Sequence, residues 1–382
     1  MHTLAGILSV ALIFIVLWDA FETIILPRRV TRKIRLTAGF YRLSWRPWSA
    51  IARRIRKPRR REAALSYFGP LSVLFLLCIW TAGMIFAFAG LHWALQTRLI
   101  SADGHPDFWT YVYMSGTDYF TLGLGDVTAA AAGPGRALTV MEAGLGFGFL
   151  AIVIGYFPVL YQAFSRREVS IVLLDARAGS PSSALEFLRH FSETRALEQL
   201  ELGLHESERW TAELLESHIS YPVLSYFRSQ HDNESWLGAT TTILDACALV
   251  MAGIREIPPR QAQLTFAMAR HAVVDIAQIL RRPPRAPVPD RLPPAMLGRL
   301  RQELATVGLE MADGEEAEAR LTQLRSVYEP YVNALAEHLS MRLPEWAPER
   351  RPLHNWETSA WGRAAAAASK AAGCTRVDDD HG

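Results

Sequence analysis

Residues 115–128 read SGTDYFTLGLGDVT, and the fold depends on what surrounds the TLGLGD at their centre. In this stretch Gly123 and Gly125 alternate with leucines, and Asp126 follows at once. A lone Gly-x-Gly is most often an ordinary turn. An ordinary turn, a phosphate-binding loop and a segment that needs a membrane around it are three open interpretations. The flanking sequence favours one of them.

Three long apolar runs lie around this stretch, at residues 4–26, 67–95 and 137–164. Only Asp19 and Glu22 interrupt the first, the second has no charged residue, and Glu142 alone interrupts the third. A helix needs roughly 20 apolar residues to cross a bilayer, so each run predicts a span. The first run has no basic segment before it and no small-residue cleavage site after it, which favours a retained span over a signal peptide. Asp19 and Glu22 are expected to face a neighbouring helix or a basic rim.

The segment between the first two spans is strongly basic. Between Arg28 and Arg61 there are 14 Arg or Lys residues and no Asp or Glu. The positive-inside rule therefore predicts a multi-pass protein of the cell (inner) membrane whose amino terminus lies outside and whose carboxyl-terminal half is cytoplasmic. We expect residues 28–61 to form an interfacial helix on anionic lipid. Its apolar anchors would be Trp45, Trp48, Ile51 and Ile55.

The glycine motif falls between the second and third spans, on the outer side. Residues 107–120 are rich in aromatic side chains and predict a short helix, with Pro106 in its first turn and Ser101 or Asp103 as the cap. That helix is too short to cross the bilayer. Non-helical backbone at membrane depth is tolerated only where it is buried in protein or lines a water-filled cavity. The pattern is typical of a re-entrant pore loop.

The residue types of the loop suit ion coordination. Backbone carbonyls can replace the hydration shell of an ion if successive carbonyls point inward. That alternation requires left-handed or mirror-region backbone at every second residue, which glycine adopts at little cost. The Thr121 hydroxyl would add a further ligand ring. A nucleotide-binding loop fits badly, because no G-x-x-x-x-G-K-[ST] is present here and no soluble strand precedes the glycines.

Thr121-Leu122-Gly123-Leu124-Gly125-Asp126 resembles the potassium channel selectivity filter, Thr-x-Gly-Tyr-Gly-Asp. The likeness covers about residues 66–165, and Leu124 looks like second-pore filters of two-pore-domain channels. WDAFETIILPRRV (18–30) and SRREVSIVLLDARAGSP (165–181) are similar to bacterial members with an added amino-terminal span. The resemblance implies a homotetramer that conducts potassium passively, with K⁺ held at Thr121, Leu122, Gly123 and Leu124. It implies no enzyme activity, and K⁺ would be transported rather than a cofactor.

Two departures keep alternatives open. Leu124 stands where the family has a tyrosine that bonds to the pore helix, and Phe120 replaces a common threonine. A weakly selective monovalent cation channel on the same scaffold is therefore an alternative. Another is a membrane-anchored sensor or scaffold that acts through its helical cytoplasmic half.

The third span carries four glycines and a proline. We expect Gly144, Gly146 and Gly148 to serve helix packing. Gly155 and Pro158 are the gating hinge candidates, because proline removes a backbone hydrogen bond and bends a helix.

The expected fold class is an all-α membrane protein with a span–pore loop–span potassium channel core. An additional amino-terminal transmembrane helix (1–27) and a basic segment (28–65) precede the pore domain (66–165). The pore domain comprises an outer helix (66–97), a pore helix (107–120), a filter (121–126) and an inner helix (136–164). A helical cytoplasmic domain (166–342) with a proline-rich linker (281–296) and a partly disordered tail (343–382) complete the chain.

The cytoplasmic half shows helix-like apolar spacing. The expected helices are 183–203, 206–220, 235–256, 260–281, 295–308 and 315–341. His205 with Glu201 and Glu208, or His271 with Asp275, has helical spacing that would suit a metal, but solvated helix faces explain such pairs better. No sequence feature points to nucleic acid, and the three cysteines show no metal spacing and predict no disulfide framework.

Overall fold

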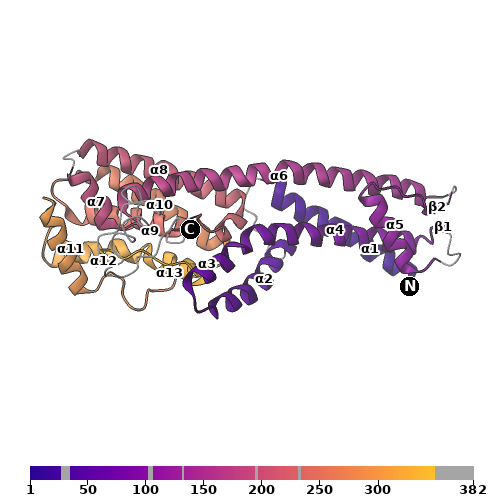
Figure 1. Cartoon of the computed structure of the whole chain (residues 1–382), viewed down its shortest axis with the longest axis horizontal. Helices are drawn as coiled ribbons and strands as arrows, with labels where there is room; N and C mark the ends of the chain where they lie inside the picture. Colours follow the sequence, from indigo (N-terminus) through magenta and orange to yellow (C-terminus); the bar gives the residue numbers. More distant parts are fainter. Residues whose placement is uncertain (27–34, 102–105, 131–132, 194–196, 231–233, 349–382) are drawn as a thin grey trace, which may run out of the picture. The chain divides into compact units, whose positions relative to one another are not determined.

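The computed structural model describes residues 1–26, 35–101, 106–130, 133–193, 197–230 and 234–348. The chain divides into two compact units (Figure 1). The first contains residues 1–50 and 67–162, and the second contains residues 51–66 and those from Ala163 onward. Residues 28–34 of the basic segment, Asp103 and residues 349–382 of the tail lie outside the described residues.

The first unit is built on two apolar helices, α1 (His2–Ala20) and α4 (Phe68–Ala94), which pack against each other. A π-helical turn, η1 (Phe21–Ile25), follows α1. A Cβ added to Gly90 of α4 would stand 2.5 Å from Ser9 Oγ, and one added to Gly83 would stand 3.2 Å from Val16. Small residues thus allow the two backbones to approach closely, as in other membrane helix pairs. The buried core around them comprises Val16, Leu76, Trp80, Met84, Phe88, Tyr119 and Leu138.

Asp19 joins three helices of this unit. Its carboxylate accepts hydrogen bonds from the backbone N–H of Thr37 at 3.0 Å, from the Thr37 hydroxyl at 2.6 Å and from the Trp80 indole at 3.1 Å. Thr37 is in the first turn of α2 (Leu36–Arg53), so Asp19 caps that helix from α1. Glu22 lies 3.4 Å from the Arg35 guanidinium. Both acidic residues of the first apolar run are therefore partnered within the protein.

The aromatic face of α2 corrects one expectation. Trp45 is only 2% exposed, and its ring centroid lies 4.8 Å from that of Phe68 at the start of α4. Trp45 therefore packs on protein and is not a lipid anchor. The large apolar side chains that α2 exposes are Leu36, Leu43 and Ile51.

A short helix, α5 (Phe108–Tyr119), and a small sheet lie between α4 and α6 (Gly135–Ala178). Strand β1 (Leu99–Ser101) pairs with β2 (Val127–Ala129) antiparallel, with Ile100 opposite Thr128. The all-α expectation did not include this sheet. The segments that enter and leave the loop run beside each other, and pairing satisfies backbone groups that no helix satisfies.

Helix α6 extends to Ala178, past the expected end at residue 164. The apolar run ends near residue 164, but the residues that follow contain no Pro or Gly until Gly179. Gly179 has a φ of 80°, and its N–H donates to the Asp175 carbonyl at 2.9 Å, so it ends the helix in the left-handed conformation that favours glycine. The change of polarity at residue 164 therefore does not mark the end of the helix.

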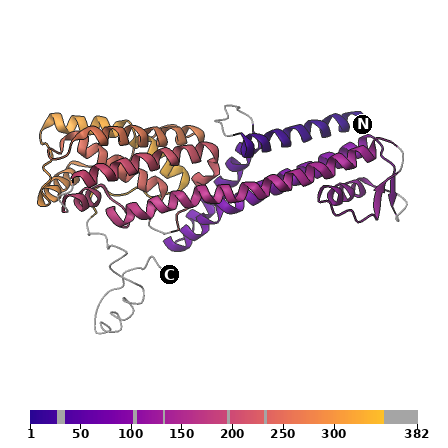
Figure 2. The ribbon, with the colours of Figure 1, turned by 90° about the horizontal axis from the view of Figure 1, so that it is seen from above.

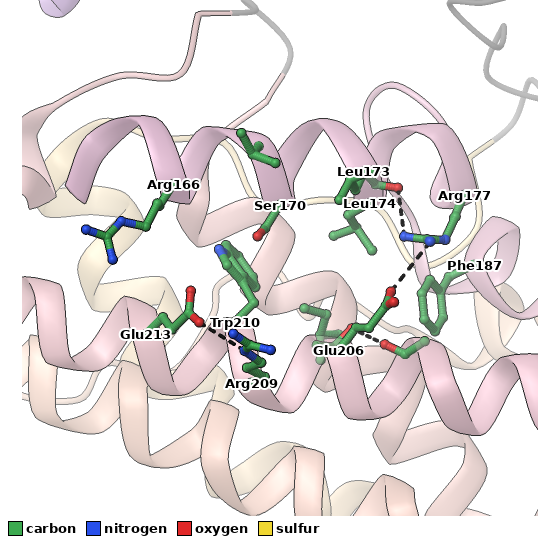
Figure 3. A pocket seen from close by; sticks show the side chains of 14 residues that line it. Arg166, Ser170, Leu173, Leu174, Arg177, Phe187, Glu206, Arg209, Trp210 and Glu213 are labelled. Carbon is green, nitrogen blue, oxygen red and sulfur yellow. Dashed lines mark hydrogen bonds and ion pairs between the residues drawn. The ribbon is translucent and has the colours of Figure 1, made fainter. Parts of the chain in front are cut away.

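The second unit is a helical bundle, whose helices lie side by side in Figure 2. It contains the last part of α6 with α3 (Pro58–Ser66), α7 (Ala184–Glu193), α8 (Leu197–Ser220), η2 (Pro222–Tyr226), α9 (Trp236–Gly253), α10 (Pro259–Ile279), α11 (Pro294–Thr306), α12 (Glu315–Ser326) and α13 (Glu329–Leu339). The expected helix 315–341 is two helices, because Pro330 has no N–H to continue α12. Between α6 and α8 lies a cavity of about 350 Å³ (Figure 3).

Among the described residues, four helices are long and apolar enough to cross a membrane. They are His2–Ile25, Pro58–Ala94, Gly135–Ala178 and Trp236–Gly253. The last is α9, whose apolar window is 83% buried, against 17%, 44% and 17% for the other three. Helices α7, α8, α10, α12 and α13 cover α9, so protein takes the place that lipid would take around a span. The helices are compatible with an all-α membrane protein.

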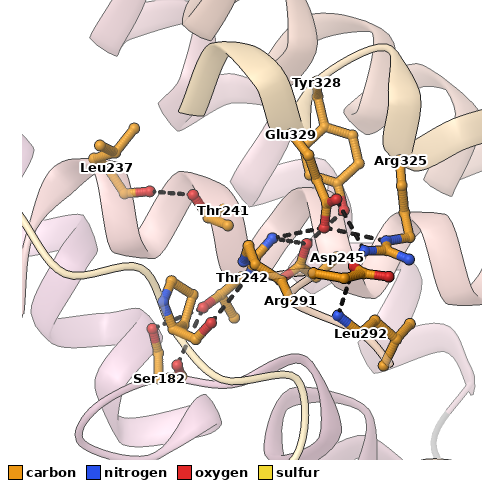
Figure 4. Close-up of polar contacts among 12 residues, drawn as sticks. Ser182, Leu237, Thr241, Thr242, Asp245, Arg291, Leu292, Arg325, Tyr328 and Glu329 are labelled. Atoms are coloured by element: carbon orange, nitrogen blue, oxygen red, sulfur yellow. Dashed lines mark hydrogen bonds and ion pairs between the residues drawn. The ribbon is translucent and has the colours of Figure 1, made fainter. Parts of the chain in front are cut away.

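A buried ionic network fastens the proline-rich segment to this bundle (Figure 4). The Arg291 guanidinium donates to Asp245 of α9 at 2.6 Å, to Glu329 of α13 at 3.0 Å and to the Pro344 carbonyl at 3.0 Å. The Tyr328 hydroxyl also donates to Asp245. Residues 281–296 are thus held against the bundle at Arg291.

Candidate functional site

The helix before the glycine motif begins with a capping box at Asp107. The Asp107 carboxylate accepts from the Thr110 N–H at 2.9 Å, and the Thr110 hydroxyl oxygen accepts from the Asp107 N–H at 3.2 Å. Hydrogen bonds from Thr110 hold the pKa of Asp107 below its usual value. The expected cap was Ser101 or Asp103. Ser101 lies in β1 instead.

The same helix ends in a Schellman motif whose left-handed residue is Thr121. The Thr121 N–H donates to the Asp118 carbonyl at 2.9 Å, and the Leu122 N–H donates to the Thr117 carbonyl at 2.8 Å. Thr121 has a φ of 58°, a conformation that is rare for a β-branched residue and usually filled by glycine. Such strain persists only where the surrounding structure imposes it, and it occurs often at functional sites.

Positive φ angles recur at every second residue of the loop. Thr121 has a φ of 58°, Gly123 of 55° and Gly125 of 78°. The intervening Leu122 and Leu124 are exposed. The structure therefore brings the six expected residues, Thr121 to Asp126, together as one extended segment with alternating backbone conformation.

The carboxyl-terminal end of the loop is held by Tyr113, which sequence reasoning missed. The Tyr113 hydroxyl of α5 donates to the Asp126 carboxylate at 2.8 Å, and the same carboxylate accepts the Val127 N–H at 3.0 Å. Strand β2 begins at Val127. The family tyrosine that Leu124 replaces would bond from the filter to the pore helix. Here the hydrogen bond runs in the opposite direction, from the Tyr113 hydroxyl of α5 to Asp126 of the loop.

A buried polar group lies on the other side of α5. Glu142 of α6 accepts from the Ser115 hydroxyl of α5 at 3.4 Å and lies 3.7 Å from His92 Nε2 of α4. All three side chains are fully buried. They join α4, α5 and α6 at one point. The sequence signal was Glu142 itself, the single charge in its apolar run.

Gly146 allows α6 to approach the carboxyl end of α5. A Cβ at this position would stand 1.8 Å from the Tyr119 carbonyl oxygen, which no side chain tolerates. A Cβ added to Gly144 or Gly148 meets no described atom within 4 Å. Of the three glycines expected to serve packing, Gly146 makes the close contact within this chain.

The hinge candidates Gly155 and Pro158 both lie on the exposed surface of α6. The helix is continuous through them. A Cβ added to Gly155 meets no described atom within 4 Å. A gating role for these residues stays a prediction.

The histidine pairs of the second unit do not form a metal site in the described part of the chain. His205 lies 3.8 Å from Glu208, and His271 lies 3.5 Å from Asp275. Within the described residues no group of three His, Cys, Asp or Glu side chains is placed to hold a metal ion. Both histidine side chains are exposed, and their acidic partners are partly buried.

Comparison with known proteins bears on the first unit. Residues 73–162 match the family model of ion channels. The match begins in α4, encloses α5 and the glycine loop, and ends in α6, and it supports an ion channel family and passive ion conduction across a membrane. It also suggests that the protein is not an enzyme. No curated protein and no solved structure matches the chain.

Proposed function

We propose that the protein is a potassium-selective channel whose filter is residues 121–126. The observation that carries the proposal is the alternating backbone at Thr121, Gly123 and Gly125, inside the segment that matches ion channels. Alternation of left-handed and right-handed residues turns successive carbonyls toward one side of a strand. The carbonyls of Thr121, Leu122, Gly123 and Leu124, with the Thr121 hydroxyl, would replace the water around a dehydrated K⁺.

We propose further that four identical chains form the pore. One loop supplies one side of a carbonyl ring, so a closed ring needs several copies. In the single chain, Phe120, Leu122 and Leu124 expose 58%, 62% and 63% of their surface. The inner helix exposes Phe147, Ile154 and Tyr161 as well. Large apolar side chains at these positions fit contact with other copies and with lipid.

A weakly selective cation channel is the second candidate, and Leu124 favours it. This residue cannot make the hydrogen bond of the family tyrosine, which would leave the filter easier to deform. The bond from Tyr113 to Asp126 supports the selective pore instead, because it ties the outer end of the filter to α5.

Orientation and surroundings complete the proposal. The basic residues of 28–61 favour a cytoplasmic position on anionic lipid, with the amino terminus outside the inner membrane. The proposal assigns K⁺ as cargo, no cofactor and no nucleic acid.

Flux through purified protein in liposomes tests the function. Wild-type protein should carry K⁺ and Rb⁺ and exclude Na⁺. Gly123→Ala should abolish K⁺ flux, because alanine at a φ of 55° is strained and alters the carbonyl alternation. The matched control is Gly298→Ala in α11, where an added Cβ meets no described atom within 4 Å. Equal K⁺ and Na⁺ flux would favour the weakly selective channel, and flux that survives Gly123→Ala would contradict the filter.

A further inference from the structure

The cavity between α6 and α8 is lined by both apolar and cationic side chains (Figure 3). Leu174 of α6, Phe187 of α7 and Ile243 of α9 form buried apolar walls. Its volume of about 350 Å³ is within the range of small-molecule sites, roughly 300–1,000 Å³. All of its lining residues belong to the second unit.

Trp210 of α8 supplies an unused hydrogen-bond donor in this cavity. Its side chain lies in the middle of the lining in Figure 3, and the residue is only 6% exposed. Its indole Nε1 has no acceptor among the described residues. A buried donor without an acceptor is unfavourable, so a bound acceptor would be favoured here.

The cavity also has an excess of positive charge. Arg177 lies 3.5 Å from Glu206, and Arg209 lies 3.1 Å from Glu213. Arg166 lines the same cavity, its side chain is exposed, and it has no ion pair among the described residues. Two of the three arginines are therefore paired, and Arg166 is available to an anion.

We propose that this cavity binds a small amphiphilic carboxylate. The apolar part of the ligand would lie against Leu174, Phe187 and Ile243, and its carboxylate would accept from Arg166 and the Trp210 indole. Charge-assisted hydrogen bonds from arginine are strong and favour carboxylates over neutral or cationic groups of the same size. Apolar walls with few convergent polar groups are typical of ligand sites.

Binding at this place would act on α6. Arg166, Leu173 and Arg177 are on the same helix as the inner span, and Trp210 and Glu213 are on α8. A ligand that contacts both helices stabilises their contact. A change in channel opening would follow only if the proposed conduction holds, so binding is measured apart from flux.

The test uses the full-length protein in lipid nanodiscs and three probes that share one apolar body, phenylbutanoate, phenylbutanol and phenylbutylamine. Calorimetric titration should show saturable binding of the carboxylate at one site per chain, about tenfold tighter than the alcohol or the amine. Arg166→Gln should lower the carboxylate affinity to that of the alcohol. Arg255→Gln, an exposed arginine away from the cavity, should leave it unchanged.

Two further variants test the site without changing its charge. Ser170→Leu places a larger side chain on the cavity wall and should abolish binding of all three probes. Trp210→Phe removes the indole N–H and should weaken the carboxylate several-fold. No saturable binding to wild-type protein, equal affinity for the three probes, or binding that survives both Arg166→Gln and Ser170→Leu would each overturn the proposal.

Discussion

At the scale of single residues, hydrogen bonds among the described residues hold the proposed filter at its two ends. The Schellman motif fixes Thr121 and Leu122 at the amino-terminal end, and Tyr113 holds Asp126 at the carboxyl-terminal end. An ion that coordinates the intervening carbonyls would therefore meet a segment of fixed length. The rigidity of that segment depends on its two end points.

Tyr113→Phe tests the carboxyl-terminal end of the proposed filter, because it removes only the hydrogen bond to Asp126. We expect the potassium-to-sodium permeability ratio to fall about twofold to tenfold, the equivalent of a typical hydrogen bond of about 0.5–1.5 kcal/mol. Reversal potentials in bilayers report the ratio. Tyr67→Phe, an exposed tyrosine at the start of α4, is the control. An unchanged permeability ratio in Tyr113→Phe would show that selectivity does not depend on the hydrogen bond to Asp126.

Gly146→Ala tests the contact between α6 and the end of α5. The new Cβ would stand 1.8 Å from the Tyr119 oxygen, so the helices must separate at a cost of about 1–3 kcal/mol or more. We expect a lower thermal midpoint and loss of flux. Gly144→Ala, two residues away on the same helix with no described atom within 4 Å, should keep both. Equal effects of the two substitutions would argue against the close contact.

At the scale of elements, buried ionisable and polar side chains decide which helices and segments meet. Asp19 joins α1 to α2 and α4, Glu142 joins α6 to α4 and α5, and Arg291 fastens the proline-rich segment to α9 and α13. Each is a costly group in a buried place, and partners from other elements offset that cost. Removing one partner of such a buried side chain should therefore weaken the packing of a whole helix or segment, beyond the loss of a single hydrogen bond.

Arg291→Met should destabilise the helical bundle by about 3–5 kcal/mol, because Asp245 is left buried without its cation. Thermal unfolding and hydrogen exchange of α9 and α13 measure the loss. The double variant Asp245→Asn with Arg291→Met should recover part of it. Arg285→Met removes an exposed ion pair to Glu337 and should cost less than about 1 kcal/mol. A small effect of Arg291→Met would show that the network is not essential.

At the scale of the whole molecule, sequence reasoning predicted what depends on length and composition. The three apolar runs lie in helices that are long enough to cross a membrane, and the glycine loop lies inside the segment that matches ion channels. Which faces of the helices and loops contact one another could not be predicted in this way. Trp45 on protein, Tyr113 on Asp126 and Gly146 on Tyr119 are contacts between separate elements, and a single sequence does not show which faces meet. The predicted end of α6 at residue 164 was wrong, because a change from apolar to polar residues indicates where a span leaves the membrane and not where the helix ends.

The proposed tetramer makes a quantitative prediction about mixed assemblies. If four chains share one pore and a single Gly123→Ala subunit spoils its filter, equal mixing of mutant and wild-type chains leaves only about 6% of pores fully wild-type, one half to the fourth power. The mutant and wild-type chains are co-expressed, purified together and reconstituted in liposomes. Their K⁺ flux should fall to about that fraction of the wild-type flux, because a carbonyl ring cannot tolerate one distorted side. Chains that each conduct alone would retain about half of the flux. Co-expression with Gly298→Ala should retain all of it. A residual flux near one half would therefore overturn the shared pore while leaving conduction itself intact.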